Sequence, residues 1–149
     1  MGIVKVHKIR NAHRAGFVIG YMPGAWDLLH AGHVMALEEA KSKCDYLIVG
    51  LGINPHIGNL LKNKPILSFE ERYALLRANR FVDAIIVYDN EYDLVEIDRW
   101  LPINIRFIGE DHRKDEKYET RGKIVYLSRK HNYSSSELRK RIMEANKQK

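Results

Sequence analysis

The chain has 149 residues, 45% of them hydrophobic and 30% charged, which is typical of one globular domain with a continuous core. It contains no apolar run near the roughly 20 residues that a membrane-spanning helix needs, so we expect no membrane partner. The formal net charge of +6 favours partners that carry phosphate, whether nucleic acids, nucleotides or small metabolites.

The chain begins with a basic segment, residues 1–16. This segment lacks the apolar core and the small-residue cleavage site of a secretory signal. Cys44 is the only cysteine, so it has no partner for an intrachain disulfide. We therefore expect a cytoplasmic protein, in which residues 1–16 are an N-terminal extension that forms an added strand, a dimer arm or disordered chain.

After this extension, short runs rich in β-branched and aromatic residues alternate with segments of helical period. The runs predict strands at 17–22, 46–51, 84–88, 105–109 and 124–127. The helical segments lie at 31–43, 68–80, 91–101 and 134–146. Ser68 with Glu71, and Ser134 with Glu137, have the spacing of helix capping boxes. The alternation predicts an α/β fold: a single-domain, Rossmann-like, doubly wound parallel sheet of about five strands with helices on both faces.

The junction between the first strand and the first of these helices carries two histidines, His30 and His33, on either side of Gly32. In open parallel sheets, ligands bind beyond the carboxyl ends of the strands where the strand order reverses, and we expect the first strand to lie there. Pro23 and Gly24 predict a turn. Gly32 allows a ligand to approach a helix start, where free N–H groups favour phosphate.

A histidine in the first turn of a helix is kept neutral by the helix dipole and can donate one hydrogen bond to a developing phosphoryl charge. The competing interpretation is that His30 and His33 only cap or pack. A zinc site is less favoured, because Cys44 is distant and the other histidines show no ligand-like spacing.

Four motifs, in order along the chain, resemble one enzyme family. GAWDLLHAGH at 24–33 is similar to the G-x-F-D-x-x-H-x-G-H signature of the H-x-G-H nucleotidyltransferases, with Trp26 in place of phenylalanine. KNKPILSFEERYALLRANRFVDAIIV at 62–87 resembles the family's lysine loop, its E-R helix start and its R-x-V-D ending. IRFIGED at 105–111 resembles M-G-D-D, and SRKHNYSSSELRKRI at 128–142 resembles R-T-x-G-I-S-T-T-x-L/I. Within this superfamily the chain resembles the cytidylyltransferase family, especially the glycerol-3-phosphate cytidylyltransferases.

The resemblance implies a nucleotidyltransferase domain over residues 17–146. It implies transfer of CMP from CTP to a small phosphorylated alcohol, with glycerol 3-phosphate as the first candidate, giving a CDP-alcohol and pyrophosphate. It also implies Mg²⁺, bound mainly through nucleotide phosphates, and a homodimer. One alternative is an ATP-dependent adenylyltransferase of the same fold that makes FAD or an ADP-sugar. The other is a non-catalytic nucleic-acid-binding protein, although the chain has no RNP-like aromatic signature and no evident recognition helix.

The resemblance also assigns residues to the site. The expected catalytic residues are His30, His33, Lys62, Lys64 and Arg129. The expected nucleotide-binding residues are Pro23, Gly24, Ala25, Trp26, Gly32, Gly109, Asp111, Ser134, Ser135 and Ser136. The expected substrate-binding residues are Asp27, Asn54, Arg72 and Arg80, and Asp27 is also the carboxylate expected to orient the water shell of Mg²⁺. No residue is expected to ligate a metal directly.

Simpler interpretations stand beside these roles, and the base of the nucleotide is left open. The serines serve equally well as a capping box, and the lysines and arginines as solvated charges. Three positions depart from the cytidylyltransferases: Asn54 stands where aspartate is common, His112 where tryptophan is common, and Lys130 where threonine is common. These positions line the base side, so the choice between CTP and ATP is less defined than the reaction type. Asp111 suits the amino group of cytosine, because a carboxylate accepts hydrogen bonds from such a donor.

Overall fold

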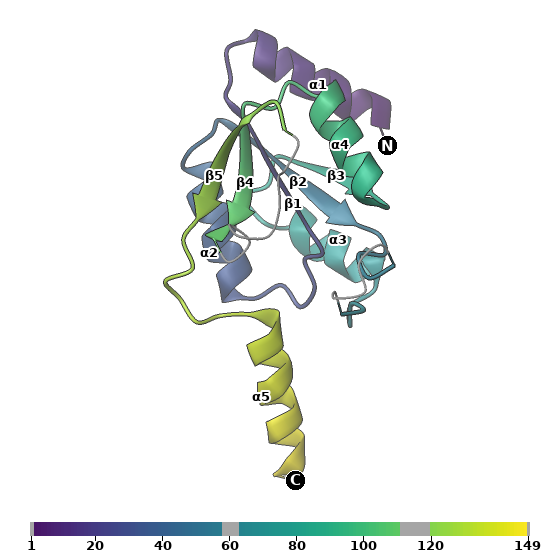
Figure 1. Ribbon diagram of the computed structural model, residues 1–149, viewed down its shortest axis with the longest axis vertical. Coiled ribbons are helices and arrows are strands. Elements are labelled where there is room, and N and C mark those ends of the chain that lie inside the picture. The colour runs from purple at the N-terminus through teal and green to yellow at the C-terminus, as the bar shows by residue number, and fades with distance from the viewer. Residues whose placement is uncertain (1, 58–62, 111–119, 149) are drawn as a thin grey trace.

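The protein is built around a parallel sheet, to which the described part of the chain contributes five strands (Figure 1). The computed structural model describes residues 2–57, 63–110 and 120–148, and side chains from residue 6 onward. The strands are β1 (Ile19–Gly24), β2 (Tyr46–Gly52), β3 (Ala84–Tyr88), β4 (Ile105–Gly109) and β5 (Lys123–Leu127). The helices are α1 (Gly2–Arg14), α2 (Ala31–Lys41), α3 (Phe69–Arg77), α4 (Glu91–Trp100) and α5 (Ser135–Lys147).

The strand order determines where a ligand can enter. The strands lie in the order β3-β2-β1-β4-β5, so the order reverses between β1 and β4. β1 pairs with β2 along its whole length, but with β4 only at Gly20 and Tyr21. β1 and β4 therefore part toward their carboxyl ends, and ligands of open α/β sheets bind in such a crevice. The expected position of the first strand at the reversal point is confirmed.

Helices cover both faces of this sheet (Figure 1), as the alternation of elements predicted. On one face, Leu37 of α2 and Leu76 of α3 are buried in one core layer. On the other face, Leu94 of α4 is buried in a second layer. Side chains alternate along a strand, so the neighbours Ile48 and Val49 of β2 fall in opposite layers. The predicted α/β, Rossmann-like architecture is confirmed.

The N-terminal extension folds as a helix, α1, so neither the strand nor the disordered chain considered from the sequence is correct. Ile9 is fully buried in the same core layer as Ile19 and Tyr21 of β1. Val6 and Ala12 are partly buried and pack against this layer. Since these three α1 side chains are spaced three residues apart, they lie along one side of the helix. α1 thus covers the same face of the sheet as α4.

The other predicted elements are confirmed, with shifts at their ends. β1 begins at Ile19 rather than at residue 17, and both Phe17 and Val18 are exposed. α3 ends at Arg77 rather than at residue 80, because the Asn79 side chain accepts a hydrogen bond from the N–H of Phe81 and turns the chain toward β3. Across the described part of the chain, no helix is both long and apolar enough to cross a membrane.

The last helix, α5, extends away from the sheet (yellow in Figure 1). The Ser134 side chain accepts a hydrogen bond from the N–H of Glu137, so the predicted N-terminal cap is present. None of the α5 side chains within the described range is fully buried. This helix is therefore positioned by polar contacts near its N-terminus rather than by a core of its own.

Candidate active site

The loop between β1 and α2 has an uncommon backbone conformation. Trp26 (φ 55°) and Leu28 (φ 49°) both adopt the left-handed region, which costs a non-glycine residue about 1–2 kcal/mol. Burial of Trp26 maintains the loop, and its indole Nε1 donates to the carbonyl oxygen of Gly50 at 2.9 Å. Asp27 lies between the two strained residues and is itself buried. The loop therefore holds a carboxylate inward at the carboxyl edge of the sheet.

His30 and His33 cap the start of α2 and orient each other. The Nδ1 atom of His30 accepts a hydrogen bond from the N–H of Gly32 at 3.0 Å. The Nδ1 atom of His33 accepts one from the N–H of His30 at 3.3 Å. The two rings stack with their centroids 3.9 Å apart. In a neutral imidazole one nitrogen accepts and the other donates, so this pattern assigns the proton of both rings to Nε2.

Both histidines are held in the neutral form. Burial, together with smaller contributions from His30 and Arg129 and against the opposing effect of Asp27, lowers the pKa of His33 to about 3. Burial also lowers the pKa of His30, with contributions from Arg129 and His131. Each ring thus presents one Nε2–H donor while the ring itself stays uncharged. Fixed neutral donors of this kind stabilise negative charge that develops on a phosphoryl oxygen.

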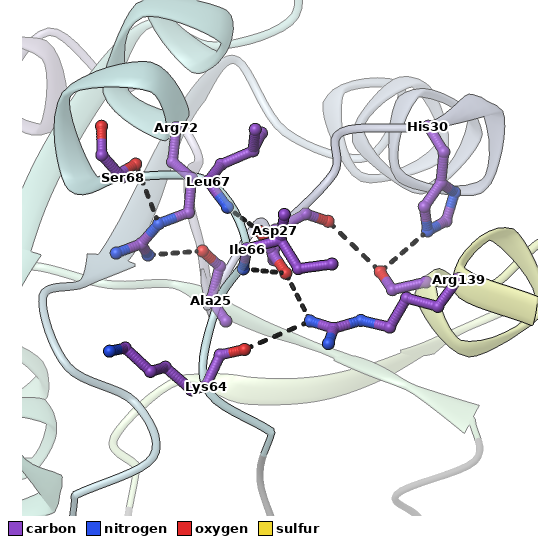
Figure 2. A network of polar contacts seen from close by, with 10 residues as sticks. Ala25, Asp27, His30, Lys64, Ile66, Leu67, Ser68, Arg72 and Arg139 are labelled. Atoms are coloured by element: carbon purple, nitrogen blue, oxygen red, sulfur yellow. Dashed lines mark hydrogen bonds and ion pairs between the residues drawn. The ribbon is translucent and has the colours of Figure 1, made fainter. Parts of the chain in front are cut away.

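The N-terminus of α5 meets His30, as Figure 2 shows. The Ser135 hydroxyl lies 3.3 Å from Nε2 of His30 and donates to the carbonyl oxygen of Asp27 at 3.2 Å. Given the tautomer above, Ser135 accepts from His30. Gly32 makes this approach possible, because a Cβ there would lie only 3.0 Å from His131 Cε1 and from Tyr133 Cβ in the segment before α5. The structure therefore brings together two regions that are about a hundred residues apart in sequence.

Asp27 joins three segments instead of facing an open site. Its Oδ1 accepts from the N–H of Leu67, and its Oδ2 from the N–H of Ile66, both at 2.9 Å. Arg139 of α5 donates to the same Oδ2 at 2.6 Å. These donors occupy three of the roughly four acceptor positions of a carboxylate. The expectation that Asp27 orients the water shell of Mg²⁺ stays a prediction, and such a contact would use the one acceptor position that remains. Within the described ranges, no cluster of three His, Cys, Asp or Glu side chains is placed to hold a metal ion.

Arg72 also has a different environment from the one expected. Its side chain is only 2% exposed, and its guanidinium donates to main-chain carbonyl oxygens. The four acceptors are Ala25, Gly52, Ile53 and Ser68. Burial lowers its pKa, and the nearby Asp27 opposes that shift. Arg72 therefore ties together the loops after β1 and β2 and the start of α3, rather than presenting a free cation to substrate phosphate. Figure 2 shows its contacts to Ala25 and Ser68.

The remaining expected residues lie at several places in the structure. Pro23 and Gly24 end β1, and Ala25 and Trp26 begin the loop after it, where the Trp26 ring packs against His33. Gly32 lies in the first turn of α2, and Ser134 and Ser136 flank Ser135 at the start of α5. Lys64 and Arg129 are exposed on segments next to α5, and Nη2 of Arg129 lies 3.5 Å from the carbonyl oxygen of Tyr133. Asn54 and Gly109 follow or end strands at the same carboxyl edge, whereas Arg80 lies over the Phe81 ring before β3, at the opposite edge. Lys62, Asp111 and His112 lie outside the described residues.

Sequence reasoning missed Arg139. Its Nη2 atom contacts Asp27 and also lies 3.3 Å from the carbonyl oxygen of Lys64. The available signal was its spacing: Arg139 follows Ser135 by four residues, which places both on one side of α5.

Comparisons with known proteins identify the family of this site. A model of the family described as cytidylyltransferase-like matches residues 21–141, from β1 into α5. The chain belongs to the cytidylyltransferase-like family. The matched span contains both histidines, Asp27, Ser135 and Arg139, so the whole contact network lies within the family's domain.

Curated relatives of this cytidylyltransferase-like domain include proteins called bifunctional protein HldE. The one from Granulibacter bethesdensis is 33% identical over 72% of this chain, and the match spans 22% of that protein. The one from Caulobacter vibrioides is 30% identical over 83% of this chain and spans 27% of that protein. The chain therefore matches only about a quarter of the length of these relatives.

Solved structures share the fold. A lipopolysaccharide core biosynthesis protein from Thermoplasma volcanium is 26% identical, with a TM-score of 0.63 over 76% of this chain and 98% of that one. A pantoate-beta-alanine ligase from Francisella tularensis, crystallised with an ATP compound and beta-alanine, is 19% identical, with a TM-score of 0.51 over 92% of this chain and 73% of that one. The second likeness is one of fold alone.

Proposed function

We propose that this chain is an ATP-dependent nucleotidyltransferase that transfers AMP to a phosphorylated sugar, giving an ADP-sugar and pyrophosphate. The observation that carries the reaction type is the stacked pair His30 and His33, with both Nε2–H groups free of backbone partners at a helix start. ATP and a sugar phosphate are preferred to CTP and glycerol 3-phosphate because the similarity to HldE proteins supports adenylyl transfer of the ADP-heptose-forming kind. The proposal thus adopts the ATP-dependent alternative recognised from the sequence.

The proposed chemistry is an in-line displacement. A phosphate oxygen of the sugar phosphate forms a bond to the α-phosphorus of the nucleotide, while the bond from that phosphorus to the bridging oxygen breaks and pyrophosphate leaves. The attacking oxygen is already anionic, so no general base is needed. Catalysis then consists mainly of positioning and charge neutralisation.

Different residues of the site would supply the positioning and the charge neutralisation. Nε2–H of His33 and of His30 would donate to α-phosphoryl oxygens, and for His30 the phosphate would replace the Ser135 hydroxyl as acceptor. The N-terminus of α5 suits another phosphate group, since the first N–H groups of a helix have no acceptors within the helix. Lys64 and Arg129 would neutralise the triphosphate. Mg²⁺ would arrive bound to the nucleotide phosphates and add further charge neutralisation.

A pyrophosphate-release assay tests this proposal. Purified protein with Mg²⁺ is given ATP, CTP, GTP or UTP in turn, each with a panel of sugar 1-phosphates that includes a heptose phosphate, and with glycerol 3-phosphate. We expect release only when ATP and a sugar phosphate are both present, and release at least about a hundredfold slower from a His33→Ala variant. Release that requires CTP and glycerol 3-phosphate would restore the cytidylyltransferase alternative. No release with any pair, together with tight RNA or DNA binding, would support a nucleic-acid-binding protein.

We also propose that the chain acts as a homodimer, as its family resemblance implies. Light scattering at the concentration of the assay measures this directly. A mass of about 17.4 kDa rather than twice that value would exclude it.

A further inference from the structure

One side of α5 holds this helix to the loop that follows β1. Ser135 and Arg139, four residues apart, both reach Asp27: the hydroxyl contacts its carbonyl oxygen and the guanidinium its carboxylate. Because α5 has no fully buried side chain in its described range, these contacts contribute more to holding the helix in place than they would in a helix packed on a core.

Arg139 makes a second contact that Ser135 does not. The Nη2 atom that lies 2.6 Å from Oδ2 of Asp27 also donates to the carbonyl oxygen of Lys64 at 3.3 Å. Figure 2 shows the guanidinium between these two acceptors. Asp27 in turn accepts from the N–H groups of Ile66 and Leu67. Arg139 and Asp27 together therefore join three segments: the β1–α2 loop, residues 64–67 and α5.

This ion pair is partly shielded from water. The Asp27 side chain is 8% exposed and the Arg139 side chain 26% exposed. A charge-assisted hydrogen bond in such a setting is stronger than the usual surface ion pair, and its loss leaves a buried carboxylate with backbone donors only. Arg139 is thus better placed to determine local geometry than the exposed Lys140, whose side chain pairs only loosely with Glu144 at 3.9 Å.

We propose that Arg139 is a positioning residue of this active site: by bridging Asp27 and the Lys64 carbonyl, it holds α5 at a fixed place beside residues 64–67. Ser135 and Lys64 then face the same bound nucleotide. This inference rests on the proposed function, because it takes the phosphates to bind between these segments. Arg139 itself need not touch the substrate.

Hydrogen exchange of the nucleotide-free protein tests the tether without any assay of activity. In Arg139→Gln we expect the amides of Ile66, Leu67 and residues 138–140 to exchange at least about tenfold faster, while amides of β1 and β2 keep their rates. Lys140→Gln removes the same charge from the next position of the helix and should leave all of these amides unchanged. Unchanged exchange at Ile66 and Leu67 in Arg139→Gln would overturn the proposal.

Kinetics then test the consequence for the site. For Arg139→Gln we expect KM for the nucleotide to rise by about tenfold with kcat within about twofold, because the nucleotide must first order the segments that Arg139 holds. Arg139→Lys keeps a cation in reach of Asp27 and should recover most of the lost affinity. If the glutamine variant does not fold, the lysine variant is compared with the unmodified protein instead. Equal KM values for Arg139→Gln and Lys140→Gln would overturn the positioning role. If the unmodified protein shows no transfer at all, the proposed function fails, while hydrogen exchange still decides whether Arg139 is a tether.

Discussion

The two histidines have different surroundings, and this difference makes His33 the more informative one to replace. His33 packs against the Trp26 ring, with centroids 5.4 Å apart, and keeps its Nε2–H for a ligand. We expect His33→Ala to lower kcat by about a hundredfold or more, the usual effect of removing one donor to a transition-state oxyanion. The measurement is steady-state pyrophosphate release. His13→Ala, which removes an exposed histidine of α1, is the control and should retain full activity. A folded, fully active His33→Ala protein would contradict the proposed role.

The low pKa of His33 also predicts how stability depends on pH. In the unfolded chain this residue titrates near its ordinary value of 6.5, but in the folded protein near 3. Between these values the unfolded chain binds a proton that the folded chain does not, so the free energy of unfolding decreases as pH falls below about 6.5. The contribution of one such group is at most about 1.4 kcal/mol per pH unit.

This dependence can be measured by urea unfolding at pH 7, 6 and 5. We expect the loss of stability on acidification to be smaller in His33→Asn than in the unmodified protein, because asparagine does not titrate and still offers an acceptor to the N–H of His30. Parallel pH profiles for the two proteins would show that His33 is protonated as readily in the folded state as in the unfolded one.

At the residue scale, the sequence predicted which residues meet at the candidate site better than it predicted the partners of each side chain. His30, His33 and Ser135 were identified by spacing and resemblance, because a helix start creates the same need for acceptors wherever it occurs. The surroundings of Arg72 were not predicted, since its acceptors are carbonyl groups of three separate loops. From the sequence, an arginine within a helical pattern is expected to be a solvated charge. Only the placement of those loops shows that it is buried.

At the scale of the element, α1 is the part that the sequence did not reveal. Its start is rich in β-branched and basic residues, which gives a weak helical preference. Burial of Ile9 against β1 supplies stability that no local pattern displays. By contrast, the strands and the helices after residue 16 were predictable because each has a clear apolar period. In addition, α3 begins with the predicted capping box and α5 with the predicted serine cap.

The burial of Ile9 leads to a stability prediction for α1. We expect Ile9→Ala to lower the free energy of unfolding by about 2–4 kcal/mol, since it removes a fully buried side chain and leaves a cavity. Chemical denaturation monitored by far-UV circular dichroism measures the change. Lys8→Ala, at the neighbouring exposed position, should change stability by less than about 0.5 kcal/mol. Similar losses in the two variants would mean that α1 is not docked on the sheet as described.

At the scale of the whole molecule, the strand order collects the site at one edge. The loop after β1 and the segments leading into α3 and α5 all meet there, because every strand of the described sheet points the same way. The same edge carries the exposed cations Arg129 and Lys64, while Arg139 and the carboxylate of Asp27 neutralise each other as an ion pair. Besides its net charge of +6, the protein therefore has exposed cations at the edge where a triphosphate would bind.

This charge distribution predicts how nucleotide binding responds to salt. Screening shortens the reach of exposed charges, from roughly 10 Å at 0.1 M salt to about 3 Å at 1 M. We expect KM for the nucleotide to rise severalfold between about 0.05 and 0.5 M NaCl, while kcat changes much less, because the histidine donors are neutral and salt screens them little. Sucrose at equal osmolality is the control and should leave KM unchanged. A KM independent of salt would mean that the exposed cations at this edge do not attract the nucleotide. In that case the affinity would have to come from the neutral donors of α2 and the N-terminus of α5.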